Sequence, residues 1–340
     1  MDVRTWPGCL LVVLASTAYA NDDVMYSAGN FQADAYASLR LQAEVVDADN
    51  LPGNFEDYTG VRDAWSRAGM KFKYQASESW SFLFQYEVPL DLANLEIQSP
   101  WNQSEDERVL KLETNGPVGK LWYGRGWIAY YNNIAYPVDQ FSSFYSGFAT
   151  FSSLRLEDTV YYASPVWNGV QLSVSSSDDN GSNNNRRNQY AVSYQGKDLF
   201  VAVGVDDIGG LQDEKVIGLA ASWNYDAWHV AIKYERFSSD ITGTGWAADG
   251  TDAANILLQY TSGKHTWRGM WADVDNFGEI TVHAGWDYQY LDNTRFFTEV
   301  YREQETAVIA DSRQTTYPGN NTDAADSGGS ALVAGIRYDF

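Results

Sequence analysis

Basic side chains alternate with apolar ones in several short stretches of the chain. Each lysine or arginine of LRL, MKFKY and LKL has an apolar neighbour on both sides. Successive side chains of a β-strand point to opposite faces, so the charges would share one face and the apolar residues the other. Grouped on one wall of a narrow space, such charges would orient dipolar solutes. The basic residues assigned to this face are Arg40, Arg67, Lys71, Lys73 and Lys111.

Side chains suited to enzymatic or metal chemistry are few. His229, His265 and His283 stand far apart without a metal-ligand spacing, and no Ser, Thr or Cys occupies a nucleophile motif. The run DADN at 47–50 begins like a calcium loop, but its glycine and its distant Glu are misplaced. Arg186 and Arg187 form too small a basic patch for nucleic acid. The sequence therefore predicts no catalytic site and no nucleic-acid partner.

A long stretch with almost no charge lies at residues 126–154. Its only ionised side chain among 29 residues is Asp139, and nine of the 29 are aromatic, including Tyr136 and Phe141. A connection this long normally signals function or disorder, and so much aromatic area argues against disorder because it must be covered. We therefore expect a loop that folds inward and packs on an interior wall.

The elements that would position these residues are strands. From residue 30 onward the chain divides into sixteen runs of alternating apolar and polar residues, with almost nothing at helical period. Tight turns such as 115–119, 167–169 and 262–264 separate every second pair of runs, and the intervening links are long and polar. Segregated turns and loops are typical of a transmembrane β-barrel, whose closure leaves no unpaired backbone in lipid. We predict an all-β fold: one sixteen-stranded antiparallel transmembrane β-barrel over residues 21–340.

Charge is divided in the same way as loop length. The eight long links hold 26 Asp and Glu against 4 Lys and Arg, which accounts for the formal net charge of −22. These links are residues 46–64, 91–107, 126–154, 178–188, 206–214, 239–252, 273–279 and 310–326. One rim should therefore be acidic and the other nearly neutral. Ca²⁺ or Mg²⁺, which favour oxygen ligands, are expected to bridge loop carboxylates to anionic lipopolysaccharide. The carboxylates expected to do so are Asp47, Asp49, Asp57, Glu105, Asp106 and Glu107.

Aromatic residues supply a further signal. The 13 Trp and 23 Tyr gather near the ends of predicted strands, for example Trp223 with Tyr225 and Trp267 with Trp271. Girdles at the two membrane interfaces explain this distribution. Cross-strand aromatic pairs in a soluble sheet are the alternative.

Residues 1–20 have the pattern of a secretory signal peptide. Arg4 precedes an apolar run, and AYA at 18–20 has the small-x-small form of a cleavage site. The single cysteine, Cys9, lies within this segment, so the exported chain would depend on burial and backbone pairing alone. Acylation of Cys9 is disfavoured because no apolar run precedes it.

Three motifs carry a resemblance to a known family. GKLWYGR at 119–125, RLEDTVYYASP at 155–165 and the C-terminal GIRYDF occur in an order and spacing that resembles the trimeric general porins of Gram-negative bacteria. The likeness spans the whole mature chain. It implies a third loop folded into the lumen, a homotrimer in the lipid of the outer membrane, and a C-terminal signal recognised by the assembly machinery. Here that signal would comprise Tyr338 and Phe340.

The resemblance also implies a constriction in which acidic residues on the third loop face a basic ladder on the wall. This sequence departs from the pattern, because the loop offers only Asp139, with Glu157 and Asp158 at its exit. Arg125 joins the predicted basic wall, although strict alternation from Leu121 would send it outward. The alternative for each wall residue is an interior ion pair with a carboxylate on a neighbouring strand: Glu44, Glu87 or Glu113.

The function expected from these features is a water-filled channel for passive diffusion of small hydrophilic solutes and ions. Its acidic mouth predicts a weak preference for cations, limited by screening. The nearer alternative is a saccharide-selective channel, in which the loop aromatics would face the lumen. The more distant one is an outer-membrane barrel enzyme such as a protease or lipase, which would need a catalytic His beside carboxylates or Ser.

Overall fold

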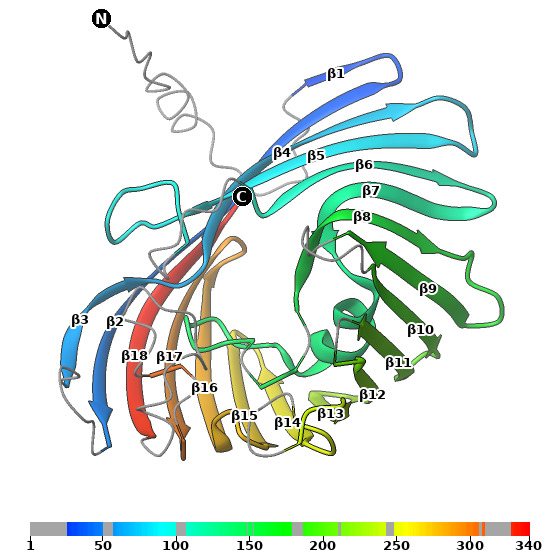
Figure 1. The fold of residues 1–340 in the computed structure, drawn as a ribbon. Helices are drawn as coiled ribbons and strands as arrows, with labels where there is room; N and C mark the ends of the chain where they lie inside the picture. The colour runs from blue at the N-terminus through cyan, green and yellow to red at the C-terminus, as the bar shows by residue number, and fades with distance from the viewer. Residues whose placement is uncertain are drawn as a thin grey trace, which may run out of the picture.

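Strands make up almost all of the regular structure (Figure 1). A computed structural model describes residues 26–49, 57–99, 107–147, 149–151, 153–178, 186–209, 212–242, 248–305, 308–309 and 328–340. The strands are β1 (Tyr26–Ala28), β2 (Phe31–Ala48), β3 (Tyr58–Asp63), β4 (Ser66–Gln75), β5 (Ser81–Leu90), β6 (Val109–Gly116), β7 (Gly119–Trp127), β8 (Arg155–Ala163), β9 (Val170–Ser177), β10 (Arg187–Gln195), β11 (Leu199–Gly209), β12 (Glu214–Tyr225), β13 (Trp228–Ser238), β14 (Asp252–Ser262), β15 (His265–Val274), β16 (Glu279–Leu291), β17 (Thr294–Glu303) and β18 (Gly329–Asp339). Two short helical segments, η2 (Tyr131–Ala135) and η3 (Tyr136–Val138), lie between β7 and β8.

The strands close into a barrel. Each strand from β4 to β18 pairs antiparallel with its neighbours, and β2 joins the two ends by pairing with both β4 and β18. β3 also pairs with β2, and it is separated from β4 only by Ala64 and Trp65, so β3 and β4 together form one strand of the barrel. With β3 and β4 counted as one and the three-residue β1 left aside, the ring has sixteen barrel strands, which confirms the predicted architecture. Closure gives every barrel strand a hydrogen-bonded neighbour on both edges, as a barrel requires.

Side chains alternate across the wall. On β2, Val45 is 51% exposed on the outer face, whereas Glu44 is 2% exposed on the inner face. Leu39 and Leu41 share the outer face with Val45, as their spacing predicts. A band of apolar side chains around the outside and polar ones within is the pattern of a barrel surrounded by lipid.

Aromatic side chains cluster beside the tight turns. Trp223 stacks on Tyr225 with ring centroids 5.3 Å apart, and Trp228 contacts Tyr260 at 4.6 Å. Tyr225 and Trp228 are paired across the β12 to β13 turn, where Asp226 takes φ 53°. The predicted gathering of aromatics at strand ends is confirmed on this rim.

Strands extend into two of the predicted long links, 206–214 and 273–279. β11 continues to Gly209 and β12 begins at Glu214, while β15 ends at Val274 and β16 begins at Glu279. The prediction used acidic residues as a loop signal, but carboxylates are compatible with a strand when the inner face supplies partners. Asp206, for example, is fully buried and accepts a hydrogen bond from Arg187 Nε at 2.8 Å.

Some of the predicted features lie on residues that the structure does not describe. The predicted signal peptide at 1–20 and the carboxylates of Glu105 and Asp106 lie outside the described residues. No helix of the described residues has the length and apolar character needed to span a membrane.

Candidate functional site

The connection from β7 to β8 folds into the barrel, as the sequence predicts (Figure 1). Its helical part lies against β11 and β12, where Tyr130 and Ile134 are fully buried. Glycines on the wall make room for it: a Cβ at Gly218 would lie 2.1 Å from the Tyr130 hydroxyl. The helical turns themselves were not predicted, because residues 126–154 show no helical period.

The tip of this loop is fixed to β17 by a carboxylate. Glu299 accepts hydrogen bonds from the backbone N–H groups of Ser142, at 2.8 Å, and Ser143, at 3.2 Å. His283 Nε2 lies 2.8 Å from the same carboxylate, and Phe141 stacks on the imidazole with ring centroids 3.6 Å apart. Because Glu299 and His283 are both buried, this contact is shielded from solvent.

A second attachment joins the loop to β2 and β3. Phe144 N–H donates to Gln42 Oε1 at 2.9 Å, and its carbonyl accepts from Trp65 Nε1 at 2.8 Å. The Phe144 and Trp65 ring centroids are 4.9 Å apart in a stacked arrangement, and the Arg62 guanidinium carbon lies 4.0 Å from the Phe144 ring centroid. Backbone and ring of one residue are thus both held by the wall.

The returning half of the loop is attached to β13. Thr150 Oγ1 donates to Glu235 at 2.9 Å, and Phe151 N–H donates to the same side chain at 3.1 Å. Lys233 forms a buried ion pair with Glu235 and donates to the Ala149 carbonyl at 2.7 Å. Most loop aromatics are therefore packed on the wall; Tyr136, 54% exposed, is the exception among those described.

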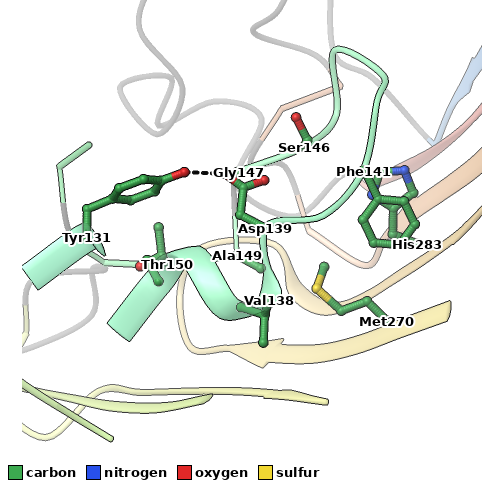
Figure 2. A pocket seen from close by; sticks show the side chains of 11 residues that line it. Tyr131, Val138, Asp139, Phe141, Ser146, Gly147, Ala149, Thr150, Met270 and His283 are labelled. Carbon is green, nitrogen blue, oxygen red and sulfur yellow. Dashed lines mark hydrogen bonds between the residues drawn. The ribbon is translucent and has the colours of Figure 1, made fainter. Parts of the chain in front are cut away.

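Asp139 lies between these attachments. Its Oδ2 accepts a hydrogen bond from the Tyr131 hydroxyl at 2.7 Å. Burial raises the pKa of Asp139, and the positive charges of Arg40, His283 and Lys233 oppose that shift. Beside it is a pocket between loop and wall (Figure 2).

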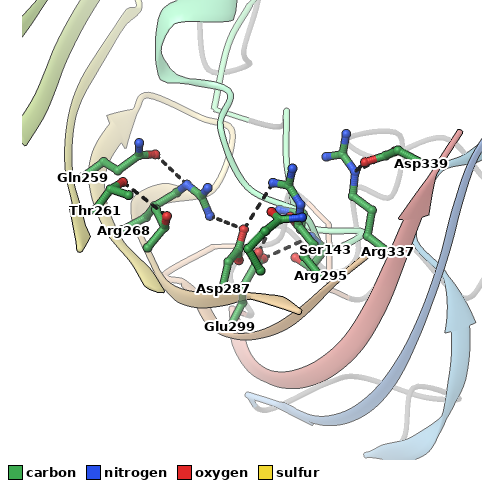
Figure 3. A network of polar contacts seen from close by, with 12 residues as sticks. Ser143, Gln259, Thr261, Arg268, Asp287, Arg295, Glu299, Arg337 and Asp339 are labelled. Carbon is green, nitrogen blue, oxygen red and sulfur yellow. Dashed lines mark hydrogen bonds and ion pairs between the residues drawn. The ribbon is translucent and has the colours of Figure 1, made fainter. Parts of the chain in front are cut away.

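Arginines from successive strands form a row on the inner wall (Figure 3). Arg40 on β2 is the direct cross-strand partner of Arg337 on β18, which in turn is the partner of Arg295 on β17. Arg67 on β4 lies opposite Ser38, two residues from Arg40. We call these four residues, with Arg268 on β15, the arginine row.

Carboxylates neutralise part of this row. Asp287 lies 2.7 Å from Arg268 and 3.6 Å from Arg295, and Asp339 lies 2.7 Å from Arg337. Arg67 lies 3.9 Å from Glu87, which also pairs with Arg108 at 2.9 Å. Arg40, 7% exposed, donates from Nε to Ser38 Oγ at 3.0 Å, and no ion pair of the described residues includes it. Arg40 therefore leaves positive charge on the wall uncompensated by a contacting carboxylate.

The predicted lysines line the same side but lie closer to the turn end of their strands. Lys71 Nζ is 4.7 Å from the Tyr36 ring centroid, and Lys73 is exposed. Lys111 pairs with Glu113 at 2.7 Å, an interior ion pair within β6 and not between neighbouring strands as the alternative supposed. Of the proposed basic wall, Arg40 and Arg67 are brought into the arginine row.

Arg125, Glu157 and Asp158 lie elsewhere, which corrects their assignment to the constriction. Arg125 is opposite Leu110, whose side chain is on the outer face, and its Nη1 lies 3.8 Å from Glu157. Asp158 accepts from the exposed Tyr123 hydroxyl at 3.2 Å. Arg125 thus keeps the outward orientation that strict alternation from Leu121 predicts, although the register with β8 shifts between Gly124 and Gly126.

Sequence reasoning missed several wall residues. Arg337 lies between Ile336 and Tyr338 in a predicted strand, the same signal that identified Arg40, whereas Arg268 and Arg295 have an apolar aromatic neighbour on one side only. Their grouping depends on cross-strand register, which one sequence does not state. Glu299 and His283 gave no signal, since Glu299 binds backbone N–H groups of a distant loop and His283 contacts the Glu299 carboxylate on another strand.

The acidic loop residues are only partly described. Asp57 Oδ1 accepts from Ala48 N–H at 3.2 Å, and Asp49 forms an ion pair with Arg302. Asp47 is exposed and Glu107 is half-buried. A different carboxylate group, Asp273 with Asp275 and Glu279, brings three ligand oxygens within 4.8 Å of one another near the β15 to β16 turn.

At the chain end, Phe340 exchanges two backbone hydrogen bonds with Ala37 on β2, at 2.9 and 3.0 Å. The Tyr338 and Phe340 rings lie 5.8 Å apart and Phe340 is exposed. Their role as an assembly signal stays a prediction.

A closed barrel with an apolar outside, a charged lumen and a loop fixed inside it defines a membrane-embedded channel. Comparison with protein families agrees: residues 9–307 match the family described as Gram-negative porin. The chain belongs to the Gram-negative porin family and is a protein of the outer membrane.

Relatives and solved structures cover nearly the whole chain. A monosaccharide porin from Halomonas sp and the major outer membrane protein of Halomonas elongata are each 23% identical over 351 residues, covering 93% of this chain and 94% of their own. The anion-selective porin from Comamonas acidovorans has a TM-score of 0.71 at 15% identity, covering 91% of this chain and all of its own. Salmonella typhi OmpF, solved with daunomycin, has a TM-score of 0.67 at 13% identity, covering 92% of this chain and 98% of its own.

Proposed function

We propose that this porin is a water-filled channel for passive diffusion of small hydrophilic solutes and ions. The observation that carries the proposal is the loop at 126–154, fixed to the inner wall on both sides of Asp139 in a lumen that the arginine row also lines. Opposed charges across a narrow, poorly screened gap would orient dipolar solutes and slow apolar ones.

Deleting residues 135–148 tests this proposal. Single-channel conductance in KCl should rise and larger solutes should enter proteoliposomes, while the barrel keeps its resistance to heat during electrophoresis. Conductance and exclusion limit equal to those of the unmodified protein would mean that the loop does not narrow the conducting path.

Within this function we propose a weak preference for cations. The net charge of −22 falls on the predicted long links, and the screening length is about 8 Å at physiological salt. The arginine row acts in the opposite direction inside the lumen. Reversal potentials across a KCl gradient at low salt measure the balance, and clear anion preference would show that the wall decides selectivity.

A saccharide-selective channel is the second candidate. It is supported by the Halomonas relative described as a monosaccharide porin, and by the exposed Tyr136, which contacts the edge of Tyr131 at 6.2 Å. Trp127 stacks on Tyr131 at 4.7 Å and completes an aromatic group at the loop start. Saturable monosaccharide uptake that is lost in Tyr136→Ala and kept in Tyr190→Ala, on the outer face, would favour this candidate.

We also propose that the protein is not an enzyme. His283 lies beside a carboxylate, but both side chains are fully buried and engaged with the loop. Hydrolysis by the purified protein that is lost on substitution of His229, His265 or His283 would overturn this.

The partners proposed are two further copies of the chain, outer-membrane lipid with lipopolysaccharide, and divalent cations at the loop end. One solved structure with a similar fold, OmpT of Vibrio cholerae, is described as a trimer form, and its sequence is 13% identical to this chain. Chemical cross-linking in detergent should give a trimer as the largest product.

A further inference from the structure

The inner wall carries an apolar patch at the long-loop end of β2 and β18. Val46 on β2 and its neighbours Ala331 and Val333 on β18 point inward, yet each is at most 3% exposed. The inner face of a barrel with a water-filled lumen is ordinarily polar. These apolar side chains are therefore covered from the lumen side by other parts of the chain.

Two segments from different connections supply this cover. Phe144 and Tyr145 come from the tip of the inward loop, and they are buried in the same apolar cluster as the wall patch. Val308 and Ile309, which we call the support segment, come from the connection between β17 and β18 and belong to the same cluster. Ile309 lies against β18, since a Cβ at Gly329 would be 3.0 Å from its Cγ2. The loop tip and the support segment thus form one apolar unit on the inner wall.

A carboxylate on β17 fixes the support segment. Glu303 accepts hydrogen bonds from Val308 N–H at 3.1 Å and from Ile309 N–H at 2.8 Å. Because Glu303 is fully buried, these charge-assisted bonds are shielded from water. Glu299 lies earlier on the same face of β17 and holds the loop tip in the same way, through the N–H groups of Ser142 and Ser143 (Figure 3).

Tyr301 joins the two attachments. It lies between Glu299 and Glu303 on the inner face of β17, and its hydroxyl donates to Glu303 at 2.9 Å. Its ring stacks on Tyr145 of the loop tip with centroids 5.0 Å apart. Closely packed rings and buried hydrogen bonds transmit displacements to one another. A shift of the support segment is therefore felt at the loop tip.

We propose that the support segment and Glu303 determine the size limit of the pore by positioning the tip of the inward loop. Ile309 is only 2% exposed, so its side chain is too well covered to contact a passing solute. Its influence on solutes passes through Phe144 and Tyr145, which makes it a positioning residue. The inference rests on the proposed channel function and deepens it.

The test compares Ile309→Ala with Ile336→Ala, the same truncation on the outer face of β18, where Ile336 is 40% exposed. Truncation of the buried Ile309 leaves a cavity beside the loop tip, so hydrogen exchange at the Phe144 and Tyr145 amides should accelerate about tenfold or more. Swelling of proteoliposomes in sugars of increasing size should show a higher exclusion limit in this variant. The strand amides should stay protected, the barrel should keep its resistance to heat, and Ile336→Ala should match the unmodified protein.

Two further variants separate support by packing and hydrogen bonding from a general loss of structure. Ile309→Val removes one methyl group and should stay close to the unmodified protein in both measurements. Glu303→Gln keeps the volume but offers one acceptor oxygen in place of two to the support segment, so it should change both in the direction of Ile309→Ala, and it carries the comparison if Ile309→Ala does not assemble. Unchanged exchange at the loop tip and an unchanged exclusion limit in Ile309→Ala and Glu303→Gln would overturn the proposal.

A double variant shows whether the effect passes through the loop. In protein that lacks residues 135–148 the loop tip is absent, so adding Ile309→Ala should not raise the exclusion limit further. An additional increase would overturn the proposal, because the support segment would then act on the pore directly. The channel function has a separate outcome: variants that conduct KCl with one common size limit contradict this inference alone, whereas unmodified protein that does not conduct KCl contradicts the function.

Discussion

Asp139 differs from an ordinary surface carboxylate in both its isolation and its environment. Burial raises its pKa above 3.8, and the groups that face it are Tyr131, Arg40, His283 and Lys233. Its charge should consequently be lost at a higher pH than that of the carboxylates at the exposed mouth. One residue thereby gives the channel a pH response of its own.

We expect cation permeability to fall on acidification at a pH above the ordinary range of aspartate. Reversal potentials measured from neutral pH downward should show this step in the unmodified protein, and Asp139→Asn should lack it. A step that persists in Asp139→Asn would assign the titration to another group.

The same shift has a consequence for stability, with a definite sign. Because the folded pKa is higher than the unfolded value, the contribution of Asp139 is fully present below pH 3.8 and is lost as pH rises through the folded pKa. Thermal unfolding of Asp139→Asn, compared with the unmodified protein across pH, should gain relative stability as pH rises.

Glu299 is predicted to hold the loop tip through both of its oxygens. In Glu299→Gln the amide group would face one of the two N–H donors, Ser142 or Ser143, and leave it unsatisfied at a cost of about 1–3 kcal/mol. Hydrogen exchange at these two amides should accelerate while the strands stay protected. Glu113→Gln, which touches no loop residue, is the control, and equal acceleration in both variants would contradict the prediction.

The inward loop illustrates how much a sequence can reveal about an element. Its path was predictable because nine aromatic residues with a single charge need a surface to pack on. Its helical turns were not, because they are set by the shape of the wall at Gly204 and Gly218 and not by a local period. Local patterns predict where a segment goes; the complementary surface decides its conformation.

A matched pair of glycine substitutions tests that account. Gly218→Ala would place a Cβ 2.1 Å from the Tyr130 hydroxyl and 2.6 Å from Ile134, so the helical segment must shift, at a cost of about 1–3 kcal/mol. Gly269→Ala on the outer face meets nothing within 4 Å. Thermal unfolding and open-channel noise should change in the first variant and not in the second. Equal behaviour of both would show that the helical segment is not seated on this wall.

The strands were the most predictable elements, since period-two alternation fixes both their existence and their facing. Arg125 follows this rule even beside a bulge, where Gly124 takes φ 129° and the register shifts. The arginine row shows a limit of sequence-based prediction, because Arg40 and Arg337 are 297 residues apart and meet only through strand pairing.

For the molecule as a whole, the fold class was within reach of the sequence, and the detailed rim was not. Acidic residues such as Asp206, Asp207 and Asp273 continue the strands, so the links at 206–214 and 273–279 are shorter than predicted. A barrel wall that extends beyond the lipid still offers backbone hydrogen-bond partners on the neighbouring strands, so polar side chains alone do not end a strand.

Divalent cations are expected to tie the acidic rim to lipopolysaccharide through Asp47, Asp49, Asp57 and Glu107. A chelator should therefore raise the rate of loop proteolysis and lower the thermal stability of protein in outer-membrane fragments. The Asp49 ion pair with Arg302 already satisfies one of these carboxylates, so Arg302→Gln should increase the sensitivity to chelator. Proteolysis and melting that are indifferent to chelator would exclude the cation bridge.

The position of the arginine row on the barrel also bears on the order of assembly. Arg40 belongs to the first barrel strand, β2, and Arg337 belongs to the last, β18. The two residues become neighbours only when β18 pairs with β2. Like charges meeting at this seam oppose the final docking step, and Asp339, 2.7 Å from Arg337, reduces the repulsion. The step that closes the barrel is consequently also the step that assembles the charged face of the pore. A barrel that is not yet closed would therefore let solutes pass without selection by the arginine row.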